Sequence, residues 1–240
     1  MTSGPSKPAS PTSFKKMFLL CVAMGMAGTP EDIVVAGNRD LAVEERQPAF
    51  ERLVSGQDVA ELVKVGKDTD RTVSERWVAI RALGLVPTVE ARQALVDFLD
   101  HGDVWARIAA SGAAGERGDR TMAGKVAMRL ADPAILVRAA AADALGKLRD
   151  PGTLGDLERA LKDPSSWYRG TSLWIRRKYV EAMASTGVES GPYLARALED
   201  KDPVVSAAAL RGLEQVAGFS YKEGRTPEEE KEAWRRWAGK

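Results

Sequence analysis

Apolar side chains recur along most of this chain at helical spacing, in a pattern that repeats every 31 residues. Within residues 132–162, the spacing predicts a helix from about Pro133 to Lys147 and a second helix after the turn at Asp150. Asp132 is predicted to cap the first helix, with Pro133 as its first residue. The predicted buried faces consist of Leu136, Val137, Ala140, Ala141, Ala144, Leu145 and Lys147 on the first helix, and Leu154, Leu157 and Leu161 on the second. The pattern therefore predicts a helical hairpin as the repeating unit.

The repeat is most visible in its arginines, because Arg76, Arg107 and Arg138 are each 31 residues apart. The same small residues surround each arginine: Ala79, Ala110 and Ala141; Ala82, Ala113 and Ala144; Gly84, Gly115 and Gly146. Three units, 70–100, 101–131 and 132–162, are in register, and residues 41–66 form a degenerate unit before them. Further units are predicted to begin at Asp163 and Asp202. A period of this length is typical of an array whose units bury apolar surface against their neighbours.

The chain is predicted to end with a helix from Thr226 to Ala238. Thr226 followed by a proline and by Glu229 provides an N-cap, a first-turn proline and a capping box. Trp234 and Trp237 lie three residues apart and are predicted to cover the last open apolar edge of the array.

The run from Asp132 to Gly146, Asp-Pro-x-x-x-Val-Arg-x-x-Ala-x-x-Ala-Leu-Gly, resembles bacterial HEAT repeats of the phycobilisome-lyase-like class. The resemblance covers roughly residues 41–217. It implies an all-α, right-handed α-solenoid of about five to six HEAT-like helical hairpins with a C-terminal capping helix. We expect the solenoid over residues 29–218 and the capping helix over 219–240. The family supports many kinds of binding, so the resemblance does not specify one function.

Two interpretations fit the N-terminal region. Residues 1–13 have the composition of a disordered tail, and an apolar segment over 14–28 contains the run Met17 to Ala27 behind Lys15 and Lys16. This segment fits either a signal peptide or a helix that caps the first repeat, and it is short for a stable transmembrane anchor. The expected compartment therefore stays open between the cytoplasm and export.

Composition excludes several classes of chemistry. With 35 basic and 34 acidic side chains the net charge is +1, so no general attraction to nucleic acid is expected. Cys21 and His101 are each the single residue of their type, which excludes an intrachain disulfide and sites built on paired histidines. His101 is expected to occupy a helix-capping position. We expect no catalytic residue, metal or cofactor.

The repeated arginines are interpreted as structural. Each is expected to bond an aspartate or a backbone carbonyl of the next repeat rather than an external acidic ligand. The expected ladder consists of Asp70, Arg76, Arg107, Asp132, Arg138 and Asp163.

An insertion of seven residues gives the best functional lead. Arg176 follows Arg138 by 38 residues instead of 31, and the segment 164–179 holds two tryptophans, two tyrosines and four cations. Such side chains are enriched at binding hot spots. The candidate partner-binding residues are Trp167, Tyr168, Arg169, Arg176 and Arg177, with local packing as the alternative for the first three. Trp174 aligns with Trp105 and Leu136 and is expected in the core, where Tyr179 fills a wider gap.

These observations favour a non-enzymatic protein–protein interaction scaffold that uses the concave solenoid face and the 164–179 insertion. We expect a monomer with a protein partner and without nucleic acid. One alternative is a phycobilin-lyase-like subunit that handles tetrapyrroles, whose propionates would pair with Arg169 or Arg177. Another is a HEAT-like DNA-binding glycosylase.

Overall fold

The computed structural model describes residues 28–239, and this part of the chain is built almost entirely from helices. The predicted tail and the apolar run Met17 to Ala27 lie outside the described residues. The chain divides between Ala94 and Leu95 into two compact units, called here the N-terminal unit and the C-terminal unit. The predicted all-α array of helical hairpins is confirmed.

The N-terminal unit begins with a well-capped helix. Thr29 and Asp32 form a capping box at the start of α2, and Arg52 reaches back from α3 to bind Asp32 with Nη2 2.6 Å from Oδ1. This contact holds α3 against α2. The helices are α2 (Pro30–Gly37), α3 (Val43–Gly56), α4 (Val59–Lys67), α5 (Val73–Leu85) and α6 (Val89–Leu99), and the boundary between the units falls within α6.

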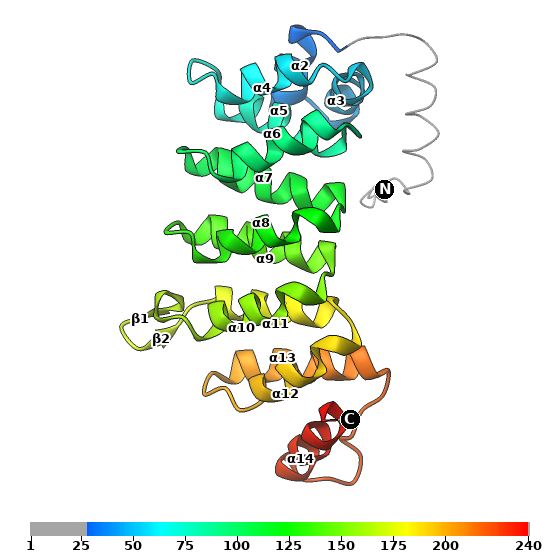
Figure 1. Cartoon of the computed structure of the whole chain (residues 1–240), viewed down its shortest axis with the longest axis vertical. Helices are drawn as coiled ribbons and strands as arrows, with labels where there is room; N and C mark the ends of the chain where they lie inside the picture. Colours follow the sequence, from blue (N-terminus) through cyan, green and yellow to red (C-terminus); the bar gives the residue numbers. More distant parts are fainter. Residues whose placement is uncertain (1–27, 240) are drawn as a thin grey trace, which may run out of the picture. The chain divides into compact units, whose positions relative to one another are not determined.

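In the C-terminal unit, the longer helices stack on one another in chain order (Figure 1). Helix α7 packs on α9, α9 on α11, and α11 on α13, while each shorter helix packs on the longer helix that follows it. The longer helices are α7 (Val104–Arg117), α9 (Ile135–Leu148), α11 (Ile175–Ser185) and α13 (Pro203–Ala217). The shorter ones are α8 (Ala123–Ala127), α10 (Leu154–Lys162) and α12 (Gly191–Ala197), before the final α14 (Pro227–Ala238).

Small residues allow this close stacking. Ala110 and Ala141 are fully buried, and a Cβ added to Gly115 of α7 would lie 2.8 Å from Cα of Ala144 on α9. The backbones of these two helices therefore approach more closely than any larger side chain at Gly115 would permit.

The insertion forms a small β-hairpin that the sequence analysis did not anticipate. Strand β1 (Trp167–Tyr168) pairs with β2 (Thr171–Ser172) in antiparallel register, and the hairpin projects from the side of the helical stack (Figure 1). Its two turn residues, Arg169 and Gly170, have φ of 49° and 79°. Positive φ at both positions is what a two-residue type I′ turn requires.

Two predictions about helix starts are wrong. Helix α9 begins at Ile135 with Ala134 as N-cap, because the carboxylate of Asp132 accepts from the Ala134 N–H within the turn that precedes the helix. His101 is likewise not a cap. Its Nδ1 accepts from the N–H of Asp103, and Asp103 caps α7. In both repeats the connecting turn occupies two residues that the sequence assigned to the helix.

The C-terminal helix starts where it was expected. Thr226 is the N-cap of α14, its hydroxyl accepts from the Glu229 N–H, and the Glu229 carboxylate accepts from the Thr226 N–H. Trp234 is completely buried, whereas Trp237 is partly exposed and lies against Gly191 at the start of α12. Helix α14 thus covers one end of the C-terminal unit.

Candidate docking site

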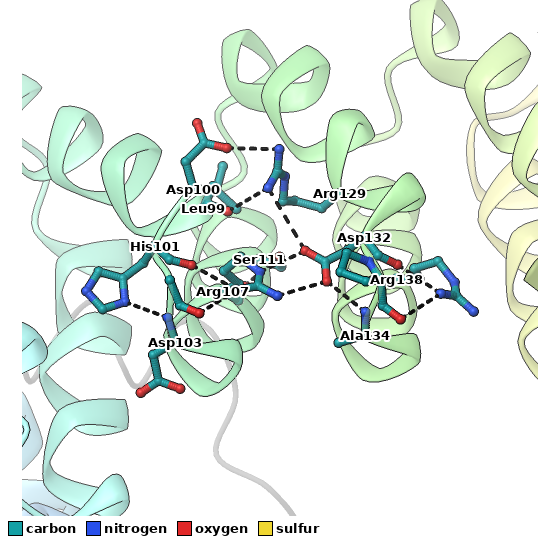
Figure 2. Close-up of polar contacts among 12 residues, drawn as sticks. Leu99, Asp100, His101, Asp103, Arg107, Ser111, Arg129, Asp132, Ala134 and Arg138 are labelled. Atoms are coloured by element: carbon teal, nitrogen blue, oxygen red, sulfur yellow. Dashed lines mark hydrogen bonds and ion pairs between the residues drawn. The ribbon is translucent and has the colours of Figure 1, made fainter.

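The repeated arginines lie in the interior, and Arg107 shows how they are held (Figure 2). Its Nε and Nη2 donate to the two carboxylate oxygens of Asp132 at 2.7 and 3.0 Å, and its Nη1 donates to the carbonyl of His101 at 2.9 Å. Burial alone would raise the pKa of Asp132, but the hydrogen bonds from Arg107 and from the Ala134 N–H bring the net pKa below its usual value. This pair joins two consecutive repeats.

Arg76 and Arg138 also donate to backbone carbonyl groups. Arg138 donates to the carbonyls of Asp132 and Ser165 at 2.8 and 3.2 Å, and Arg76 donates to the carbonyl of Gly66 at 3.2 Å. The guanidinium group of each side chain therefore bonds to groups of the protein itself.

Two aspartates that the sequence placed in this ladder have other positions. Asp163 is exposed, and its carboxylate accepts from the Ser165 N–H. Asp70 is also exposed, and its own N–H donates to Asp68. Both lie in connecting turns, where an aspartate bonds most readily to the backbone two residues away.

Arg176 belongs to this interior group and is not available to a partner. It is 2% exposed, its Nη1 and Nη2 both bind the carboxylate of Asp200, and its guanidinium lies 4.1 Å from the centroid of the Trp167 ring. The expectation that Arg176 binds a partner is therefore wrong. Sequence reasoning also missed Asp200, although its spacing offered a signal: it follows Arg176 by 24 residues, and Asp132 follows Arg107 by 25.

The tip of the hairpin presents the remaining candidates to solvent. Tyr168 and Arg169 are exposed, and the Arg169 guanidinium lies 5.2 Å from the centroid of the Tyr168 ring. Arg177 is also exposed and forms an ion pair of 3.2 Å with Glu181 on the same face of α11. Trp167 is half-buried above Arg176 and links the hairpin to the helical stack.

The prediction that Trp174 lies in the core is wrong, because this residue is 52% exposed. Tyr179, by contrast, is completely buried, and its burial raises the pKa of its hydroxyl. Large apolar residues are also exposed at the same position of the other repeats of the C-terminal unit, two residues before the repeated arginine or, in the last repeat, before Ser206. The four residues are Trp105, Leu136, Trp174 and Val204, called here the exposed row.

The exposed row crosses the C-terminal unit. Trp105 and Leu136 are both 49% exposed, and they begin α7 and α9, which pack directly on each other. Trp174 and Val204 continue the row at the starts of α11 and α13. Four large apolar side chains therefore recur, exposed, at one repeat position on successive packed helices.

Beside the hairpin the exposed row borders a hollow of about 720 Å³, called here the hairpin hollow. Its walls include Trp167, Trp174 and Val204, with the cations Arg177 and Lys201. Asp202 also lines it, but the Ser172 hydroxyl and the Val204 N–H lower the pKa of this carboxyl and engage it in the turn before α13. The hollow is thus apolar inside and cationic at its edge.

Over residues 28–239, no cluster of three or more His, Cys, Asp or Glu side chains could hold a metal ion. Among the described helices, none combines the length and apolar character needed to span a bilayer.

Comparison with known proteins identifies the repeat. Residues 137–163 match the family model of the PBS lyase HEAT-like repeat. No curated protein matches the chain. Because the matched segment includes Val137, Arg138, Ala141 and Gly146, it contains the same positions that define the 31-residue period.

Solved structures show a similar fold. YibA of E. coli matches with a TM-score of 0.54 and 18% identity over 90% of this chain and 80% of its own. Kap121p matches with a TM-score of 0.51 and 16% identity over 87% of this chain and 26% of its own, so the chain spans about a quarter of that protein. The CpcE–CpcF complex of phycocyanin lyase from Nostoc sp. matches with a TM-score of 0.45 and 22% identity over 88% of this chain and 81% of that one. The chain thus contains a segment that matches the PBS lyase HEAT-like repeat, and it has an α-solenoid fold similar to those of YibA and Kap121p.

Proposed function

We propose that this protein is a non-enzymatic scaffold that binds a protein segment along the exposed row and in the hairpin hollow. The observation that carries this proposal is the row itself, in which Trp105, Leu136, Trp174 and Val204 are each about half exposed at one repeat position. A monomeric protein gains nothing in stability from exposing large apolar groups in register, whereas a docking surface requires them.

Charge around the hollow specifies the kind of segment that fits. Arg177 and Lys201 line its edge and Arg169 is exposed on the adjoining hairpin, while Asp202 is engaged by backbone and hydroxyl donors. A segment with an aromatic or leucine anchor flanked by aspartate or glutamate would fill the apolar walls and meet this positive edge. The packed helices keep the surface in place before binding, so little ordering entropy opposes association.

A randomised peptide library selected against the whole chain tests the proposal. We expect the enriched peptides to combine an aromatic or leucine residue with neighbouring carboxylates. Fluorescence anisotropy should show at least tenfold weaker binding to Trp174→Ser, and weaker binding of all variants as salt is raised. Met128→Ser is the matched control, because Met128 is 56% exposed in the same unit but lies outside the row.

Three results would contradict the proposal. One is the absence of any enriched peptide, and another is enrichment of basic peptides. The third is equal binding to wild type and Trp174→Ser. The same purified protein, isolated from its native cell, should carry no visible absorbance, whereas a tetrapyrrole-handling subunit would retain pigment.

A further inference from the structure

The N-terminal unit contains a second concave feature, separate from the docking site proposed above. It is a cavity of about 340 Å³ between the end of α2, the helix α3 and the helix α5. Three arginines line it, Arg39 from the α2–α3 loop, Arg46 from α3 and Arg81 from α5, together with the rings of Phe50 and Trp77. We call it the arginine pocket. Its volume lies in the range of small-ligand sites.

Arg46 supplies an unpartnered buried donor at this pocket. Its Nε is buried and has no hydrogen-bond partner in the described structure. A buried donor on a charged group that lacks an acceptor is costly, and a missing ion or ligand is one of its ordinary explanations. The pocket is therefore lined by a positive side chain with one donor that no described residue satisfies.

Arg39 and Arg46 differ from the arginines that have structural roles elsewhere in the described chain. Arg52, Arg107 and Arg176 each bind an aspartate. In contrast, no carboxylate lines the pocket, and neither Arg39 nor Arg46 forms an ion pair with a described residue. Three positive side chains gathered around one cavity attract an oxyanion, and the planar fork of the guanidinium matches carboxylate and phosphate oxygens.

The aromatic walls indicate what should be attached to that oxyanion. Phe50 is almost fully buried, and the Arg81 guanidinium carbon lies 5.3 Å from the centroid of its ring. Trp77 is half-buried on α5 and also lines the cavity. A flat apolar body would cover these rings while its charged end faces the guanidinium groups.

We propose that the arginine pocket binds a small organic anion in which a carboxylate or phosphate is attached to a flat apolar group. This site does not depend on the exposed row, and its ligand would not occupy the hairpin hollow.

The test follows the indole N–H resonance of Trp77 by NMR during titration with four probes: phenyl phosphate, benzoate, inorganic phosphate and benzyl alcohol. We expect at least one of the two aromatic anions to shift the Trp77 resonance saturably, and their relative affinities identify the preferred oxyanion. Inorganic phosphate should bind at least tenfold more weakly than the better aromatic anion. Benzyl alcohol should leave the resonance unshifted.

Arg46→Met and Arg39→Met should each weaken binding of that anion at least tenfold. Lys64→Met is the matched control, because Lys64 is an exposed cation of the same unit outside the pocket. Arg39 is exposed in a loop, so its replacement tests the site even if Arg46→Met fails to fold. The proposal is overturned if neither aromatic anion shifts Trp77, if benzyl alcohol or inorganic phosphate binds as tightly, or if Arg39→Met binds like wild type.

Discussion

Arg107 and Asp132 form a two-point ion pair between consecutive repeats, with Nε 2.7 Å from Oδ2 and Nη2 3.0 Å from Oδ1. Both residues are almost fully buried, and the same carboxylate also accepts from the N–H of Ala134. A pair of this kind contributes modest net stability, because desolvation of the two charges offsets much of their attraction. Removing one partner lowers the stability of the fold much more, since the other charge stays buried without a counter-ion.

Asp132→Ala should therefore lower the free energy of unfolding by about 3 kcal/mol, because it leaves the Arg107 guanidinium buried without its carboxylate. Urea denaturation of the purified chain measures this change. Asp143→Ala is the control, since Asp143 pairs with Lys178 at the surface and its loss should cost less than about 1 kcal/mol. Equal losses for the two variants would contradict the structural role of the buried pair.

The same pair predicts an acid dependence of stability. The pKa of Asp132 is lowered in the folded chain, so its contribution is present above the unfolded pKa of about 3.9 and is lost as pH falls through the folded value. We expect the stability difference between wild type and Asp132→Asn to be constant from about pH 5 to 8 and to shrink below about pH 4. Denaturation series at several pH values measure it, and a difference unchanged at pH 2 would exclude this linkage.

Replacing two glycines at the same repeat position by alanine should change the stability of the fold differently. A Cβ at Gly115 would lie 2.8 Å from Cα of Ala144, whereas a Cβ at Gly146 would lie at 3.5 Å from Cα of Ala182, an ordinary contact. Gly115→Ala should lower the free energy of unfolding by about 1–3 kcal/mol through overpacking. Gly146→Ala should be neutral or stabilise by up to about 1 kcal/mol through helix propensity. Thermal unfolding compares them, and identical shifts would contradict the close approach of α7 and α9.

The period of the sequence was sufficient to predict the helical hairpins, because buried positions such as Ala110 and Ala141 recur with it. It did not determine which face of a helix is exposed. Trp174 is two residues from the buried Arg176, which places it about 200° around the helix. The position of the arginine could therefore have indicated that Trp174 is exposed, but its apolar character suggested the core.

Other features depend on tertiary structure that no local pattern encodes. The 31-residue period offers no counterpart for the insertion, so it does not predict the β-hairpin formed there. Arg39, Arg46 and Arg81 do not share a repeat position, so their gathering around one cavity follows from how α2, α3 and α5 pack. A periodic pattern predicts contacts between equivalent positions and misses those between unrelated ones.

Trp234→Ala should loosen the C-terminal end before the rest of the unit. The Trp234 ring is fully buried and lies 5.5 Å from Phe219 and 4.8 Å from Tyr221, measured between centroids. Its loss should lower the local stability of α14 by about 3–5 kcal/mol. Hydrogen exchange should accelerate in α12 and α14 and stay unchanged in α9. Trp237→Ala, at a partly exposed position, should have a smaller effect, and uniform acceleration through the unit would argue against a capping role for α14.

Gly170→Val should disrupt the β-hairpin while the helical stack stays folded. Gly170 has φ of 79°, a conformation that costs a residue with a side chain about 1–2 kcal/mol, and a β-branched residue more. Arg169→Asn is the matched change, because asparagine tolerates the positive φ found at that position. The cross-strand contact between Trp167 and Ser172, observed by NMR, should disappear in Gly170→Val and persist in Arg169→Asn.

Since Gly170 and Thr171 line the hairpin hollow, the selected acidic peptides should also bind Gly170→Val more weakly. Retained peptide affinity without the cross-strand contact would show that the exposed row binds its partner without the hairpin.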